Sequence, residues 1–133
     1  DDAARFVRMA REYAGVEVWE QDFLALDLPD AEFAGVFANA SLFHLPTQEL
    51  LRVLRVLRAC LRPRGVLFAS NPCGSNKEGF SRGCYGAYHD LERWRSDVTA
   101  AGFDEIRHHY RPPGLPREQQ LWLVTLWWRR EKV

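Results

Sequence analysis

The sequence lacks several features that would identify a protein class at once. Its three cysteines include no CxxC pair, which argues against a disulfide framework or a zinc knuckle and favours a reducing compartment. No apolar run approaches the roughly 20 residues that span a bilayer, and no secretory leader is visible. Basic and acidic residues number 18 each, so no net charge attracts nucleic acid or an anionic membrane. We therefore expect a cytoplasmic protein with no nucleic-acid or membrane partner.

Motifs for nucleotide, hydrolase and metal chemistry are also missing. The chain contains no glycine-rich GxGxxG turn and no P-loop, and Ser41 does not lie in a GxSxG nucleophile elbow. Of the four histidines, His108 and His109 are adjacent in an expected strand and should point to opposite faces. His44 and His89 have no carboxylate or thiolate at metal-ligand spacing. We expect no metal site.

The stretch from Phe33 to Asn71 is the most informative part of what is present. It reads as a strand, an amphipathic helix and a second strand, a crossover that makes the two strands parallel and buried on both faces. Ligands of such sheets bind beyond the carboxyl ends of the strands, so we expect function between Asn39 and His44. The expected elements are a strand at Phe33–Ala38, a helix with Thr47 as N-cap or Pro46 in first position, a turn at Pro63 and Gly65, and a strand at Val66–Ser70.

The flanking segments complete a single α/β domain over residues 1–133, of which 47% are hydrophobic. The loop at Asn71–His89 is long for a compact domain and leaves the sheet on the ligand side, so we expect a lid. The other elements that we expect are a helix at Ala3–Ala14 stopped by Gly15, a short strand at Val16–Glu20, a helix capped by Asp90 and running to Ala101, an edge strand at Phe103–Tyr110 and a last strand at Leu121–Trp128.

Three polar residues should lie along one edge of this sheet. Asp1 precedes the first helix, Asp22 ends the short strand and Asn39 ends the next one. Carboxylates in such places accept hydrogen bonds from ribose hydroxyls or from the exocyclic amine of adenine, and Phe23 could lie against the ring. The competing interpretation makes Asp1 a helix cap and Asp22 a turn former. The residues alone leave both interpretations open.

The order of these elements resembles the class I S-adenosylmethionine-dependent methyltransferases. The resemblance implies a doubly wound, Rossmann-like sheet, mostly parallel with an antiparallel last strand, and S-adenosylmethionine as cofactor. Arg64 departs from the family pattern, because glycine often stands there, and Ala34 replaces the usual aspartate. The segments that carry the resemblance are VEVWEQDF (16–23), FAGVFANASLFHL (33–45), LRPRGVLFASN (61–71) and AAGF (100–103).

The resemblance also implies which residues hold the cofactor. Asp1 would bind the ribose, Asp22 and Phe23 the adenine, and Asn39 with Ala40 the methionine side.

For the acceptor, which we expect to be a small molecule, the resemblance leaves four candidates near the ligand edge. His44 and His89 are the possible general bases, and Tyr85 and Tyr88 are possible substrate contacts from the lid.

The family's first strand and glycine-rich loop have no counterpart in the sequence. We therefore expect an N-terminally truncated domain that binds S-adenosylmethionine weakly or not at all by itself. The alternative is a non-catalytic module that self-associates through an exposed sheet edge, with the Phe33 strand and Trp127–Trp128 as the sticky parts.

Overall fold

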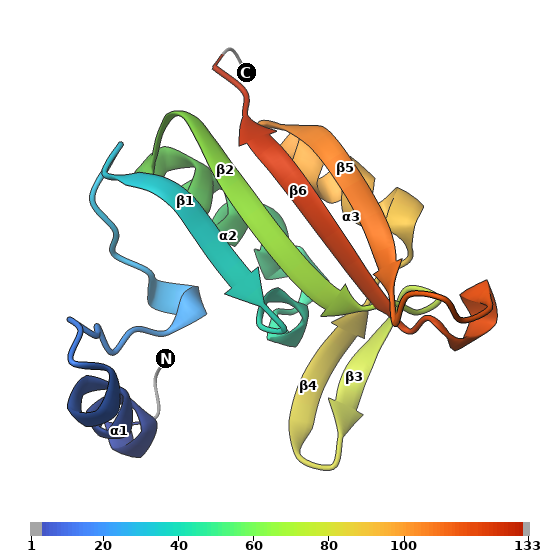
Figure 1. Ribbon diagram of the computed structural model, residues 1–133, viewed down its shortest axis with the longest axis horizontal. Helices are drawn as coiled ribbons and strands as arrows, with labels where there is room; N and C mark the ends of the chain where they lie inside the picture. Colours follow the sequence, from blue (N-terminus) through green and yellow to red (C-terminus); the bar gives the residue numbers. More distant parts are fainter. Residues whose placement is uncertain (1–3, 132–133) are drawn as a thin grey trace.

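The computed structural model describes residues 4–131, which form a four-stranded mixed sheet, two helices packed on it, a separate two-stranded hairpin and an N-terminal helix (Figure 1). The elements are α1 (Ala4–Ala14), β1 (Phe33–Asn39), α2 (Thr47–Cys60), β2 (Leu61–Pro72), β3 (Lys77–Ser81), β4 (Cys84–Tyr88), α3 (Leu91–Ala100), β5 (Phe103–Arg111) and β6 (Trp122–Arg129), with short 3-10 turns η1 (Phe23–Ala25), η2 (Leu42–His44) and η3 (Arg117–Gln119).

The sheet has the strand order β1-β2-β6-β5. β1 pairs with β2 in parallel, and β6 is antiparallel to both β2 and β5. Three strands therefore share one direction and the last strand opposes them. This confirms the expected α/β fold, the Phe33–Asn71 crossover and the antiparallel last strand.

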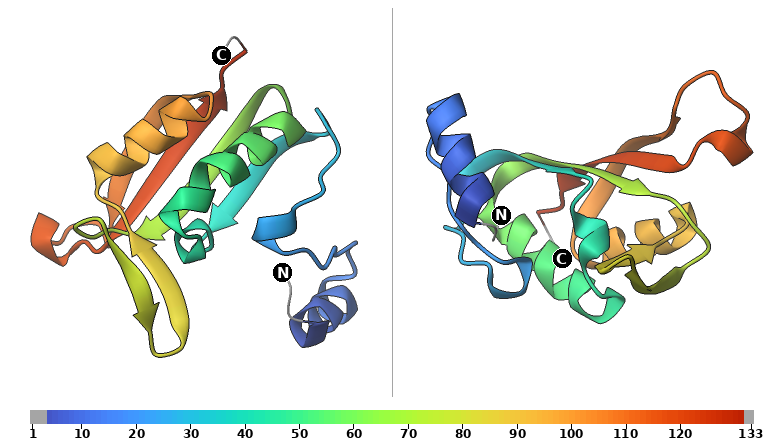
Figure 2. Two further views of the ribbon diagram at one scale, coloured as in Figure 1. Left: turned by 180° about the vertical axis from the view of Figure 1, so that it is seen from behind. Right: turned by 90° about the horizontal axis from the view of Figure 1, so that it is seen from below.

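The core lies between one face of the sheet and the helices α2 and α3, which both pack on that face (Figure 2). Apolar residues of α2 recur at helical spacing, so a single stripe of Leu50, Val53, Leu54 and Leu57 faces the strands and is at most 5% exposed. α3 begins as expected, because the carboxylate of Asp90 accepts a hydrogen bond from the amide of Arg93.

The opposite face of the sheet corrects the expectation that β1 is buried on both sides. Phe37 of β1 is 72% exposed and stacks on Phe68 of β2, with 4.5 Å between ring centroids. Trp128 is 47% exposed, whereas Trp127 is fully buried against the helices. Expecting both tryptophans to be exposed was therefore wrong, because neighbouring strand residues point to opposite faces.

Two further expectations differ from the structure. Residues 16–20 form no strand, because none of the residues from 4 to 131 pairs with them; instead, the Arg11 guanidinium donates to the Val18 carbonyl. The expected lid is a β3–β4 hairpin rather than an irregular loop. Its turn has positive φ at Arg82 (51°) and at Gly83 (81°), the backbone that tight hairpins need.

α2 begins where the sequence predicts, but its first residues are arranged differently. Pro46 occupies the N-cap site and Thr47 is the first helical residue, so neither expected arrangement is correct. No helix among the described residues is both long and apolar enough to cross a membrane.

Arg64 has a left-handed backbone with φ of 63°, at the position where the resemblance led us to note that glycine is common. This conformation costs a non-glycine residue roughly 1–2 kcal/mol, and glycine costs less there despite its larger unfolded-state entropy. We expect Arg64→Gly to raise the free energy of unfolding by about 0.5–1 kcal/mol in urea denaturation. Arg62→Gly, at a nearby exposed position without positive φ, serves as the control and should not stabilise. Equal losses in both variants would contradict the backbone argument.

Candidate functional site

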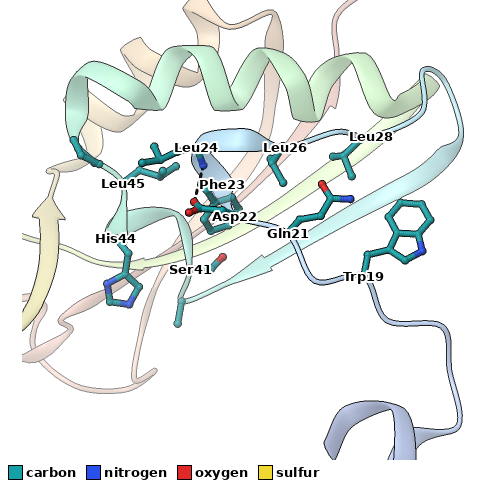
Figure 3. A pocket seen from close by; sticks show the side chains of 12 residues that line it. Trp19, Gln21, Asp22, Phe23, Leu24, Leu26, Leu28, Ser41, His44 and Leu45 are labelled. Atoms are coloured by element: carbon teal, nitrogen blue, oxygen red, sulfur yellow. Dashed lines mark hydrogen bonds between the residues drawn. The ribbon is translucent and has the colours of Figure 1, made fainter. Parts of the chain in front are cut away.

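A cavity of about 710 Å³ lies at the carboxyl end of β1 (Figure 3). Its walls come from two stretches of chain, one before β1 and one after it. One is the segment between α1 and β1, from Trp19 to Leu28; the other follows β1, from Ala40 to Pro46. The volume is in the range of small-molecule and cofactor sites, which is about 300–1,000 Å³.

The first wall is shaped by hydrogen bonds within the segment itself. The Gln21 side chain accepts from the Asp27 amide (2.9 Å) and donates to the Asp27 carbonyl (3.0 Å), which closes a loop. Inside this loop the Asp22 carboxylate accepts from the Leu24 amide (2.9 Å) and caps η1. Asp22 is therefore a turn former and also lines the cavity, so the two interpretations from the sequence are compatible.

Apolar side chains form most of the remaining surface. Phe23, Leu26 and Leu28 line the cavity and are also packed against the core, while Leu45 comes from the opposite wall and is 3% exposed. A carboxylate beside a flat apolar surface suits a heteroaromatic ring that carries an amine, because the carboxylate can accept hydrogen bonds from that amine.

The ends of β1 and β2 are tied together beside this cavity. The Ser70 hydroxyl donates to the Asn39 side-chain oxygen (2.8 Å), and the Ala40 amide donates to the Ser70 carbonyl (2.8 Å). Ala40 has φ of 52°, so the chain turns sharply here. As a result Asn39 lines a neighbouring cavity of about 370 Å³, and Ala40 lines both cavities.

His44 lines the larger cavity from η2. Its Nδ1 lies 2.8 Å from the carbonyl oxygen of Tyr85 on the hairpin. Because a carbonyl can only accept, Nδ1 must carry the proton in this contact, and the neutral ring keeps its lone pair on Nε2. A lone pair on Nε2 is what a general base requires.

Glu78 fastens the hairpin to the start of α2. One of its carboxylate oxygens accepts from the Tyr85 hydroxyl (2.5 Å) and from the Thr47 amide (3.0 Å). The bonds from Tyr85 and Thr47 hold the pKa of Glu78 below its usual value. The bond between Tyr85 and Glu78 also raises the pKa of Tyr85. The carboxylate also lies at the helix N-terminus, where negative charge is favourable. This contact has no signature in the sequence, since Thr47 and Glu78 are 31 positions apart.

His89 occupies a different environment. It is 8% exposed, its Nε2 lies 3.2 Å from the Thr47 hydroxyl, and its ring stacks on Trp94 with 6.2 Å between centroids. Burial lowers the pKa of His89, because the charged ring would lose its water. It does not line the cavity that contains Asp22.

Comparison with known proteins bears on this arrangement. A family model described as a methyltransferase domain matches residues 1–65. The structure is similar to Burkholderia thailandensis 1,6-didemethyltoxoflavin-N1-methyltransferase, with 18% identity and a TM-score of 0.77 over 98% of this chain and 59% of that one. The fold is that of a class I methyltransferase. This confirms the resemblance identified in the sequence.

Two other methyltransferase structures agree. An S-adenosylmethionine-dependent methyltransferase from Mesorhizobium loti has 15% identity and a TM-score of 0.75, with 97% of this chain and 78% of that one covered. One from Leishmania major has 11% identity and a TM-score of 0.81, with coverage of 96% and 52%. No curated protein sequence matches the chain. The chain thus spans little more than half the length of the Burkholderia and Leishmania methyltransferases.

Within this methyltransferase fold, the residues expected from the sequence separate into three sets. Asp1 lies outside the described residues. Four line the larger cavity together: Asp22, Phe23, Ala40 and His44. The remaining four do not line it: Asn39, Tyr85, Tyr88 and His89. The sequence reasoning missed the apolar wall, although the leucines at 24, 26 and 28 alternate in a way that could have indicated it.

The buried His89 should make stability depend on pH. In the unfolded chain His89 has the ordinary histidine pKa of about 6.5, and in the folded protein its pKa is lower. Between these two values the unfolded state therefore binds more protons than the folded state. The stability that depends on a neutral His89 is fully present above about pH 6.5. It is lost as the pH falls toward the pKa that His89 has in the folded protein.

We therefore expect the free energy of unfolding to fall between pH 7.5 and 5.5, and His89→Gln to reduce that slope. His109→Gln, at an exposed position of β5, is the control and should leave the slope as it is. Urea denaturation across this pH range measures both. Slopes that are the same in the wild type and His89→Gln would show that His89 does not contribute.

Proposed function

We propose that the chain takes part in methyl transfer from S-adenosylmethionine to a small-molecule acceptor, and that the larger cavity binds the adenosine of the cofactor. The observation that carries this proposal is the position of Asp22 and Phe23 in a cavity at the carboxyl end of β1, on a class I methyltransferase fold. The similar Burkholderia structure contains S-adenosylhomocysteine together with its acceptor, which supports the cofactor class.

The residues of the cavity fit an adenosine group. The Asp22 carboxylate is an acceptor for the exocyclic amine, and Phe23 with Leu26 and Leu45 offers an apolar surface for the ring. Ala40, a small residue at the sharp turn after β1, leaves room where the two cavities adjoin. Ribose and methionine contacts from Asp1 and Asn39 stay predictions.

When bound, S-adenosylmethionine supplies a methyl group on a positively charged sulfur. The chain's own contribution is to align the acceptor, exclude water and receive a proton if the acceptor is protonated. We assign the proton to His44 Nε2, since the Tyr85 carbonyl holds the other ring nitrogen protonated. The acceptor atom would give its proton to Nε2, and its freed electron pair would form the new bond to the methyl carbon while the methyl–sulfur bond breaks and leaves its electron pair on the sulfur, which becomes neutral.

His44 is the better base of the two histidines that the sequence indicated. It lines the cavity, whereas His89 is buried with Nε2 beside the Thr47 hydroxyl. Tyr85 and Tyr88 belong to the hairpin, and we retain them as candidate acceptor contacts. The three cysteines are free thiols, which supports a cytoplasmic location.

A non-catalytic, self-associating module is the second candidate. It is favoured by the exposed aromatic surface at Phe37 and by the outer edge of β1. β1 pairs with β2 on one side, and on its other side no strand among residues 4–131 pairs with it. It gives no reason for a carboxylate and a histidine to share a cavity, so we rank it below methyl transfer.

The proposal predicts that Asp22→Asn weakens binding of S-adenosylhomocysteine about tenfold or more. The amide oxygen can still accept from Leu24, but an amide nitrogen replaces the acceptor that the adenine amine needs. Chemical-shift titration of the full chain measures this, because it follows weak as well as tight binding.

Asp27→Asn is the matched control, since it makes the same charge change in the same segment but does not line the cavity. It should leave the affinity within about twofold of the wild type. Equal effects of the two substitutions, or no binding by the wild-type chain at millimolar ligand, would overturn the proposal.

A further inference from the structure

The cavity of about 370 Å³ next to the proposed cofactor site has a chemistry of its own. We propose that it binds the methyl acceptor, and that the acceptor is an aromatic carboxylate. This inference rests on the proposed function for the identity of the reaction, but the binding it describes can be measured separately.

The strand register explains why side chains from β2, β5 and β6 line this cavity together. Ser70 of β2 lies opposite Val124 of β6, and two residues away Trp122 of β6 lies opposite Arg111 of β5. All four therefore point to the face of the sheet that α2 and α3 leave uncovered. Asn39 at the end of β1 completes the polar side of the cavity.

Arg111 supplies a positive charge that no described residue neutralises. The two acids of β5 are engaged elsewhere: Asp104 pairs with Arg130 at 3.0 Å and Glu105 with Arg95 at 2.7 Å. Among residues 4–131, Arg111 has no ion pair and no side-chain hydrogen bond. A guanidinium in this state recognises a carboxylate well, because its planar fork matches the two oxygens.

The rest of the wall favours a flat apolar body between that charge and the cofactor. Trp122 is 38% exposed, and Pro112, Pro113 and Val124 add rigid apolar surface. An aromatic ring stacks favourably on an indole face. At the other end, Asn39 and Ala40 lie where the cavity adjoins the proposed adenosine site, so a ring held by Arg111 and Trp122 would point its far edge toward the cofactor.

The test compares benzoate with benzamide, which has the same shape but no charge, by chemical-shift titration of the full chain without cofactor. We expect benzoate to bind at least about tenfold more tightly than benzamide. The amides of Asn39, Ala40 and Trp122 should move most, since they line the cavity.

Arg111→Gln should remove the preference for benzoate, while Arg107→Gln should keep it. Arg107 is the matched control: it lies on the same strand and on the same face, opposite Leu126, and does not line the cavity. Arg111→Gln should bind S-adenosylhomocysteine as the wild type does.

Equal affinity of the wild type for the two ligands, no binding of benzoate at millimolar concentration, or equal losses in both arginine variants would overturn the inference. Failure of the proposed function looks different. In that case the chain would not bind S-adenosylhomocysteine, although benzoate would still bind through Arg111.

Discussion

The site depends on the parallel pairing of β1 with β2. This pairing is held by the burial of the apolar stripe of α2, whose four main residues are at most 5% exposed, against the same face of both strands. At the carboxyl end it is fastened by the Ser70 hydroxyl on Asn39 and by the Ala40 amide on the Ser70 carbonyl. The sharp turn at Ala40 then separates two cavities. One faces the segment before β1, and the other faces β5 and β6.

The hairpin places one further constraint on the site. Glu78 joins Tyr85 to the first amide of α2, and the Tyr85 carbonyl in turn fixes the proton on His44 Nδ1. The negative charge of Glu78 is favourable at the helix N-terminus, so the same contact stabilises α2 and orients a histidine at the cavity. The hairpin, fastened in this way, links the proposed base to the fold, and the base would lose its orientation if the hairpin moved.

Much of the fold could be predicted from local sequence pattern, because periodicity and caps are short-range signals. The helices, the crossover and the edge position of β5 followed from such patterns. Residues 16–20 did not form a strand, since pairing depends on a partner and not on the β-branched residues themselves. The exposure of Phe37 was missed for a similar reason: an apolar strand indicates burial, but what covers each face lies elsewhere in the chain.

The candidate site was predictable where residues come soon after an expected strand, as the stretch from Asn39 to His44 does after Phe33–Ala38 and as Asp22 and Phe23 do after residues 16–20. The family resemblance added Ala40 as a cofactor contact. Contacts between distant segments, such as Glu78 with Thr47 or Arg111 beside Trp122, have no sequence signature, because they arise from the register of strands and the path of a hairpin. Nuclear Overhauser effects between S-adenosylhomocysteine and the full chain test most directly whether the larger cavity binds adenosine. The adenine protons should show cross-peaks to Phe23 and Leu45; cross-peaks confined to Trp122 and Val124, or none at all at saturating ligand, would contradict that assignment.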